Sequence, residues 1–172
     1  MPKLLALLLA AGVLAASLTA LSQAAVSSED MEERAGLLYK SGDSTPYTGA
    51  VRDLHQSGKP RLEAHYQAGK LTSSRIWYEN GQLAEEVSVS QDTWTIRRFS
   101  ENGRLEDEIV ARFQGGRKVS EQSRMWHDNG KLRSEAGFQA GKLHGPLREY
   151  DPNGVLVRDE VYEQGKLVKK NK

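Results

Sequence analysis

Cysteine is absent from the 172-residue sequence, and its absence excludes several kinds of chemistry. Without thiols the chain can form no disulfide, no thiolate zinc site and no cysteine nucleophile, and it offers no N-terminal cysteine for a lipid anchor. An excess of charge of one sign is also lacking, since 24 lysines and arginines stand against 23 aspartates and glutamates. A chain so close to neutral does not have the basic surface of a nucleic-acid-binding protein, so we expect no nucleic-acid partner.

Catalytic motifs are missing as well. No Gly-x-Ser-x-Gly elbow occurs, and Gly115-Gly116-Arg117-Lys118 lacks the residues that flank a phosphate-binding loop. The histidines are His55, His65, His127 and His144. We expect no catalytic residue, no cofactor and no metal site, although His65 beside a carboxylate of a neighbouring strand would resemble an acid–base pair.

A long apolar run is found at the N-terminus, from Leu4 to Ala16, directly after Lys3. Small residues at Ser22 and Ala24 offer a cleavage site, so residues 1–24 predict a helical secretory signal peptide that is cleaved near Ala24. The mature protein would then be exported, either to the periplasm or out of the cell. The alternative is an uncleaved membrane anchor, because Leu4 to Ala25 is long enough to cross a bilayer.

The rest of the chain contains a repeat. Glycines that end a short polar turn recur at intervals of 22 to 27 residues; these anchor glycines are Gly58, Gly81, Gly103, Gly130 and Gly154. Four residues before them stand the large side chains Leu54, Trp77, Phe99, Trp126 and Tyr150. Two residues after them stand Pro60, Leu83, Leu105, Leu132 and Leu156. Fixed periods of this length mark a repeat architecture.

The residues before the anchor glycines are turn formers, and Asn-Gly between alternating runs is a strong hairpin signal. A two-residue type I′ turn competes with a type I turn that is followed by a glycine in the left-handed region. Pro152 favours the longer turn, because proline suits the second position of a type I turn but would remove a ladder N–H from the shorter hairpin. In this register Trp126 lies opposite Leu132. A second turn, such as Gly69-Lys70, follows eleven residues after an anchor.

Polar and apolar residues alternate between the turns with a period of two. The sets expected to share a face are Leu132, Ser134, Ala136 and Phe138 in one strand and Leu83, Glu85, Val87 and Val89 in another. No segment after residue 35 has a 3.6-residue period. We therefore predict an all-β protein of tandem β-hairpin repeats that form one elongated, twisted antiparallel meander sheet, in which neighbouring copies stabilise one another.

Three further segments complete the predicted organisation. Residues 25–35 are acidic and predict a flexible lead-in, with a single helical turn at most. The repeat array covers residues 36–168 and starts with an opening hairpin, 36–54, that caps about five copies of 22–27 residues. Residues 169–172 are a basic tail, for which solvation is the simple interpretation and weak peripheral contact with anionic lipid the alternative.

Charge repeats together with the turns. Six residues before the anchor glycines lie Arg52, Arg75, Arg97, Arg124 and Arg148, and five residues after them lie Glu63, Glu86, Glu108, Glu135 and Asp159. We interpret these residues as a surface ladder of arginine–carboxylate pairs that holds neighbouring strands in register. A charged recognition stripe is the alternative, but a single ligand site seldom needs a residue in every repeat.

Aromatic residues allow two interpretations. Trp77, Trp94, Trp126, Tyr66, Tyr78 and Tyr150 would form either the apolar face of the sheet or a stacking platform for a glycan or a peptide. Trp94 departs from the repeat, because the corresponding residues elsewhere include Gly49 and Gly145. It is our candidate for a recognition residue.

The segment from Leu37 to Gly49, followed by units such as Trp77 to Leu83 and Phe138 to Gly145, resembles the bacterial MORN-variant repeat family, often labelled a YwqK-type antitoxin component. The resemblance covers about residues 36–168. It implies an elongated β-hairpin array that is used for protein contact and has no known catalytic residues. The copies at 82–94 and 104–118 are degenerate.

The sequence thus predicts a non-enzymatic exported repeat protein, a protein–protein interaction module or scaffold in the cell envelope. Its unknown protein partner would bind along the sheet face or by strand addition at an edge. One alternative is an antitoxin or immunity-like protein that neutralises a partner toxin. Another is an envelope hydrolase that uses histidine and carboxylates.

Overall fold

The computed structural model describes residues 26–171. The signal peptide or anchor predicted for residues 1–24 lies outside this range. Within it, no helix has the length and apolarity needed to cross a membrane.

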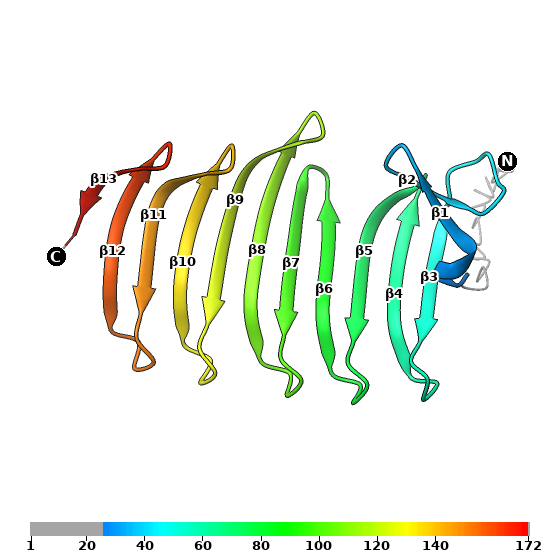
Figure 1. Cartoon of the computed structure of the whole chain (residues 1–172), viewed down its shortest axis with the longest axis horizontal. Helices are drawn as coiled ribbons and strands as arrows, with labels where there is room; N and C mark the ends of the chain where they lie inside the picture. Colours follow the sequence, from blue (N-terminus) through cyan, green and yellow to red (C-terminus); the bar gives the residue numbers. More distant parts are fainter. Residues whose placement is uncertain (1–25, 172) are drawn as a thin grey trace, which may run out of the picture.

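Eleven strands form one antiparallel sheet in which each strand pairs with its neighbours in sequence. They are β3 (Gly49–Leu54), β4 (Pro60–Gln67), β5 (Lys70–Trp77), β6 (Leu83–Ser90), β7 (Thr93–Phe99), β8 (Leu105–Gln114), β9 (Arg117–Trp126), β10 (Leu132–Gln139), β11 (Lys142–Tyr150), β12 (Leu156–Glu163) and β13 (Lys166–Lys170). Figure 1 shows them in one row, with β3 and β13 at the two ends. The prediction of an all-β antiparallel meander is confirmed.

The five anchor turns share one hydrogen-bond pattern. At the fourth turn the amide of Gly130 donates to the carbonyl of His127 at 2.8 Å, and the amide of His127 donates to the carbonyl of Lys131 at 2.8 Å. Gly130 has φ +79°, in the left-handed region. This is the predicted type I turn closed by a left-handed glycine, and it sets Trp126 opposite Leu132.

The second turns are tighter. In the β4–β5 hairpin Gln67 pairs with Lys70, so that only Ala68 and Gly69 form the loop. Both have positive φ, 48° and 76°, as a type I′ turn requires. Anchor turns and two-residue turns alternate along the chain, although in the β6–β7 turn Gln91 has a positive φ and Asp92 does not. Each repeat therefore has one long-turn end and one short-turn end.

A bulge beside each anchor turn changes the predicted faces. Leu132 lies opposite Trp126, whereas Ser134 lies opposite Met125, the neighbour of Trp126. Neighbours in a strand point to opposite faces, so Leu132 and Ser134 do as well. The prediction that Leu132 shares a face with Ala136 and Phe138 is wrong, and the same offset separates Leu83 from Glu85.

The two faces of the sheet differ in composition. The buried apolar residues Val51, Ala64, Val87 and Ala111 all lie on one face, which we call the core face. The other face carries the repeated arginines and carboxylates, and we call it the ladder face. Because successive side chains of a strand point to opposite faces, the buried apolar residues lie on one face of the sheet and the paired charges on the other.

The N-terminal part of the chain differs from the prediction. The single helical turn predicted within residues 25–35 is present as a short 3-10 turn, Ser28–Asp30, but Met31–Arg34 form strand β1 and not a lead-in. Strand β2 (Leu37–Lys40) pairs with β1 and not with β3, so the opening hairpin predicted for residues 36–54 is also wrong. The β1–β2 hairpin instead contacts the β4–β5 turn, where the amide of Leu38 donates to the carbonyl of Gly69 at 2.9 Å.

The C-terminal tail is structured as well. Lys169 and Lys170 belong to β13, which pairs with β12. Past the strand, the amide of Asn171 donates to the carbonyl of Asp159 at 2.8 Å. Lys169 and Lys170, interpreted as part of a solvated tail, therefore belong to the last strand of the sheet.

Candidate interaction surface

The repeated arginines and carboxylates form one continuous row across ten strands. Arg52 faces Glu63, Glu63 faces Arg75, and the alternation continues through every strand pair to Arg148 and Asp159. Eight of these neighbouring pairs form ion pairs at 2.8–3.9 Å. This geometry is the predicted register-holding ladder, and most of its charges are already paired within the sheet.

Histidines of the anchor turns connect one repeat to the next. His55 Nε2 lies 2.8 Å from the carbonyl oxygen of Trp77, and His127 Nε2 lies 2.8 Å from that of Tyr150. At the same repeat position the Tyr78 hydroxyl donates to the carbonyl of Phe99 at 2.7 Å. His55 and His127 therefore pack each anchor turn against the next repeat.

His65 meets a carboxylate, but on its own strand. Its Nε2 lies 2.9 Å from Glu63 Oε1, two residues earlier in β4. The hydrogen bond from His65 and the pairing with Arg52 hold the pKa of Glu63 below its ordinary value. Because Glu63 already accepts from Arg52, the geometry is that of an exposed extension of the ladder.

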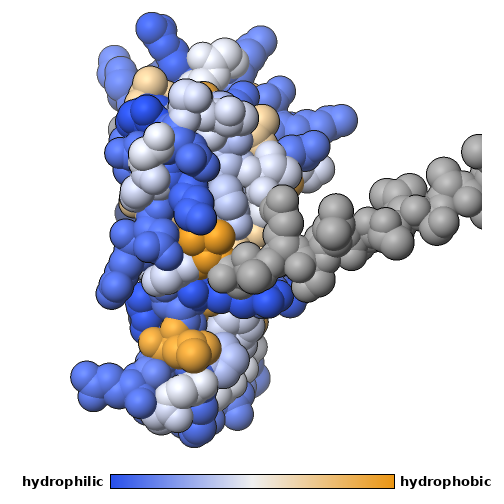
Figure 2. Space-filling view, turned by 90° about the vertical axis from the view of Figure 1, so that its right-hand side faces the viewer, coloured by the Kyte–Doolittle hydropathy of each residue, from blue (hydrophilic) through white to orange (hydrophobic). Residues whose placement is uncertain are grey.

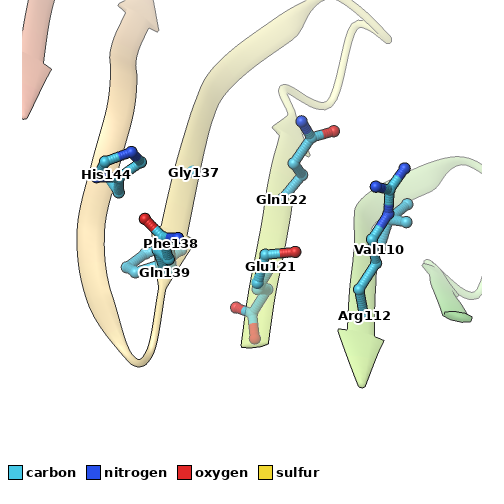
Figure 3. Close-up of a pocket in the computed structure, with 9 residues that line it drawn as sticks. Val110, Arg112, Glu121, Gln122, Gly137, Phe138, Gln139 and His144 are labelled. Carbon is cyan, nitrogen blue, oxygen red and sulfur yellow. The ribbon is translucent and has the colours of Figure 1, made fainter. Parts of the chain in front are cut away.

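A shallow hollow of about 340 Å³ lies on the ladder face between β8 and β11. Figure 3 shows Arg112, Gln122 and His144 around it, with Gly137 at the β10 position. A Cβ at Gly137 would come within 2.5 Å of the carbonyl oxygen of His144, so this glycine allows β10 and β11 to approach. Phe138 pairs with Leu143 while Ala136 pairs with Leu147, and this offset leaves His144, Gly145 and Pro146 opposite Gly137.

The aromatic candidates lie on different faces. Trp77 and Trp126 pair with leucines beside the anchor turns on the ladder face. Trp94 lies on the core face, where its ring centroid is 5.8 Å from that of Phe113. The two rings are tilted by 48° and form an ordinary packing contact, in which half-buried Trp94 fills the space left by Ala111 opposite it.

The ionisable groups of residues 26–171 do not form a metal site. No three histidine, aspartate or glutamate side chains there have the arrangement of a metal site. Side chains that share a repeat position are separated by two strands, or about 10 Å. The repeats resemble one another, whereas the two edge strands, β3 and β13, have different surroundings.

The N-terminal edge of the sheet is covered. Val26 runs along β3, where its amide donates to the carbonyl of Ala50 at 3.2 Å and its carbonyl accepts from the amide of Arg52 at 2.9 Å. The next residues are tied to buried Asp53, which accepts from the Ser28 hydroxyl at 2.6 Å and from the Ser28 amide at 2.9 Å. Figure 2, which views this end, shows a largely hydrophilic surface with small, separate hydrophobic areas.

Asp53 is held in its charged form. Burial raises the pKa of its carboxyl, but the hydrogen bonds from Ser28 and Ser27 and the charge of Arg61 outweigh burial and bring the pKa below its ordinary value. Arg61 Nη2 lies 2.9 Å from Asp53 Oδ2. This carboxylate therefore fastens the segment that covers the β3 edge.

The C-terminal edge is open in the described structure. All five residues of β13 are exposed, and no strand lies beyond it in the sheet. Leu167 and Val168 are 50% and 52% exposed. Nearby on β12 and its turn, Val155, Leu156 and Val157 are 59%, 44% and 63% exposed. Most of the exposed large hydrophobic side chains of residues 26–171 are thus at this end of the sheet.

Two short apolar runs near the C-terminus indicate this exposed surface in the sequence, although they are not part of the repeat pattern. Val155-Leu156-Val157 and Leu167-Val168 are runs of adjacent apolar residues. Such runs depart from the alternation of apolar and polar residues that one-sided burial requires. Val155 precedes β12, and Val157 and Val168 are the extra residues at bulges, so these side chains are not all buried on the core face.

Tandem hairpins joined by alternating turn types, in a sheet where each strand pairs with its sequence neighbours, define a β-hairpin repeat protein. Three segments of the chain, residues 73–91, 122–140 and 143–164, match the family model of the MORN repeat variant. This protein therefore carries MORN-variant repeats, and the resemblance seen in the sequence is confirmed for these segments. A comparison with curated proteins gives no match. The antitoxin label and a bacterial origin remain predictions.

Proposed function

We propose that this chain is a non-enzymatic, exported repeat protein that binds a protein partner in the cell envelope through its open β13 edge. The observation that supports the proposal most is the contrast between the two ends of the sheet. Val26 and the bonds to Asp53 cover the β3 edge, whereas β13 pairs only with β12, has no strand on its outer side within residues 26–171, and exposes Leu167 and Val168. Long exposed edges promote association, and natural proteins usually protect them.

The backbone of β13 is suited to accept another strand. The amide of Asn171 donates to the carbonyl of Asp159, which is the bond that flanks a non-bonded pair of an antiparallel ladder. The next pair, Glu160 and Lys170, is then a non-bonded pair, and the N–H and C=O of Lys170 point away from β12. Strand addition uses such outward backbone groups for affinity and side-chain pockets for specificity.

Export rests on residues 1–24 alone, whose apolar run and small-residue cleavage site are those of a signal peptide. The predicted contact of the basic tail with lipid concerns this same edge, because Lys169 and Lys170 belong to the proposed binding strand. A lipid surface therefore becomes a competing ligand for the same residues.

The test compares two variants at one residue. Lys170→Pro removes the outward N–H, while Lys170→Ala keeps the N–H but also removes the Lys170–Glu160 ion pair of 3.6 Å. We expect the tagged wild-type chain and Lys170→Ala to capture the same partner from envelope extract, and Lys170→Pro to lose that partner while keeping its melting temperature within a few degrees of that of Lys170→Ala. Equal capture by all three chains would contradict binding at this edge.

A further inference from the structure

We propose, on the basis of the edge-binding function above, that the segment added to β13 is an extended peptide that carries acidic side chains together with apolar ones. The inference concerns the chemistry of the partner, which follows from the side chains that β13 displays.

The first observation is the charge of the edge strand. Lys166, Lys169 and Lys170 are exposed, and β13 itself contains no acidic residue. Only Lys170 has a carboxylate partner, Glu160, at 3.6 Å. Glu160 is itself largely committed, because it is 6% exposed and pairs with Arg158 at 2.8 Å and with the Tyr162 hydroxyl at 2.9 Å. The edge therefore presents unneutralised positive charge.

The second observation is that the charge is mixed with exposed apolar surface. Leu167 and Val168 lie between the lysines in the strand. A strand that pairs with β13 would place its own side chains about 4.5–5.5 Å from these residues, so apolar and acidic side chains at successive positions would contact Leu167, Val168 and the lysines. Like charges at those positions would be destabilising.

The same lysines disfavour the simplest rival occupant, a second copy of β13. Two antiparallel copies of Lys166–Lys170 would bring lysines of both chains together along one edge. Edge lysines are a common means of preventing self-association. The lysines would weaken binding of a second copy of β13 and strengthen binding of an acidic strand, and both effects favour the acidic strand as partner.

The experiment uses a fluorescent peptide in which valine or threonine alternates with glutamate, titrated against the full chain and followed by fluorescence anisotropy. A second peptide carries lysine in place of glutamate. The variant Lys166→Glu/Lys169→Glu reverses the edge charge but leaves Lys170 and its ion pair intact. The matched control is Lys70→Glu/Lys142→Glu, since Lys70 and Lys142 also begin strands directly after second turns.

We expect the acidic peptide to bind the wild-type chain and the control alike, and to bind the edge variant roughly tenfold more weakly, a difference of about 1.4 kcal/mol. We also expect the lysine peptide to bind the edge variant better than it binds the wild-type chain. Equal binding of both peptides to the wild-type chain would overturn the inference, and so would binding to vesicles with anionic lipid but not to the peptide. A β13-dependent dimer that excludes the peptide would assign the edge to a second copy instead.

The two proposals fail separately. If the acidic peptide does not bind while Lys170→Pro still abolishes partner capture, the edge is used but its partner has another chemistry. If Lys170→Pro captures as well as Lys170→Ala does, the edge-binding function itself is wrong, whatever the peptide does.

Discussion

At the residue scale, backbone conformation at the turns sets the pattern on which the whole array depends. The anchor glycines have left-handed φ values, and nothing lies within 4 Å of where a Cβ would be at Gly130. A substitution there is penalised by conformation alone and not by a clash. The residue scale is therefore where turn assignment can be tested without disturbing packing.

Gly130→Val is expected to lower the free energy of unfolding by about 1–3 kcal/mol, because a β-branched side chain is strained in the left-handed region. Lys131→Ala removes one exposed hydrogen bond, from Lys131 Nζ to the carbonyl of Asn153, and should cost about 1 kcal/mol or less. Urea unfolding of both variants makes the comparison. Equal midpoints would count against the turn assigned here.

Ala140 offers a change in the opposite direction. It has φ 47° in a two-residue turn, a conformation that asparagine tolerates better than alanine. Ala140→Asn should stabilise the chain by about 0.5–1 kcal/mol, measured as a higher melting temperature. Gln139→Asn, one residue earlier in extended β10, serves as the control and should not stabilise it.

The residue scale also shows where sequence reasoning succeeds and where it fails. Pro152 was enough to predict the length of the anchor turn, since a proline constrains its own backbone and removes one donor. The faces next to the turns were predicted wrongly, because the bulge that follows each left-handed glycine adds one residue to one strand. A bulge shifts the alternation of faces by one residue, and this shift cannot be detected in the sequence where polar and apolar residues are mixed on both sides of the bulge.

At the element scale, neighbouring strands are held together by the ladder and by bonds between successive anchor turns. The ladder arginines are 40–59% exposed and its carboxylates 14–33% exposed. Exposed ion pairs contribute about 0–1 kcal/mol each, so the ladder specifies register more than it adds stability.

Members of the ladder are not equivalent. Glu108 is 14% exposed and lies between Arg97 at 2.8 Å and Arg124 at 3.5 Å. Glu108→Gln leaves two arginines beside a neutral group and should destabilise the chain by about 1 kcal/mol. Glu63→Gln, at a carboxylate that is 33% exposed, should cost less, and exposed Glu106→Gln close to nothing. Thermal unfolding that ranks Glu106→Gln as the most harmful would contradict the ladder.

The cover of the β3 edge depends on the charge of Asp53. A carboxyl whose folded pKa is depressed stabilises the fold above its unfolded pKa, near 3.8, and this contribution is lost as the pH falls through the folded value. Asp53→Ala should therefore lower stability at pH 7 by about 1–3 kcal/mol, with a smaller difference from the wild type at pH 3. Urea unfolding of both chains at the two pH values checks this, and a difference that grows toward low pH would contradict it.

Most strands of the sheet could be predicted from the sequence, whereas the strands at the two ends of the described chain could not. Regular repeats made β4 to β12 readable from turns and alternation alone. Met31–Arg34 carries no alternation and pairs only because β2 lies beside it. Lys169 and Lys170, the last two residues of β13, were predicted to belong to a solvated basic tail, residues 169–172. Both segments are strands because of tertiary pairing, which a local pattern does not reveal.

At the scale of the whole molecule, the sheet has one covered edge and one open edge. A meander in which each strand pairs with its sequence neighbours leaves its first and last strands with a partner strand on one side only. Here the first strand is covered by residues of the same chain, whereas the last displays lysines and apolar side chains. This asymmetry gives the repeat array a direction and places its proposed partner at one end.

Amide hydrogen exchange of the free chain, followed residue by residue by NMR at neutral pH, tests this asymmetry most directly. We expect slow exchange for the amide of Arg52, which bonds to Val26 across the covered edge. We expect the outward amide of Lys170 to exchange much faster than the inward-facing amide of Asn171. Fast exchange at Arg52 would show that the β3 edge is not covered. Protection at Lys170 in the free chain would show that the β13 edge is not open.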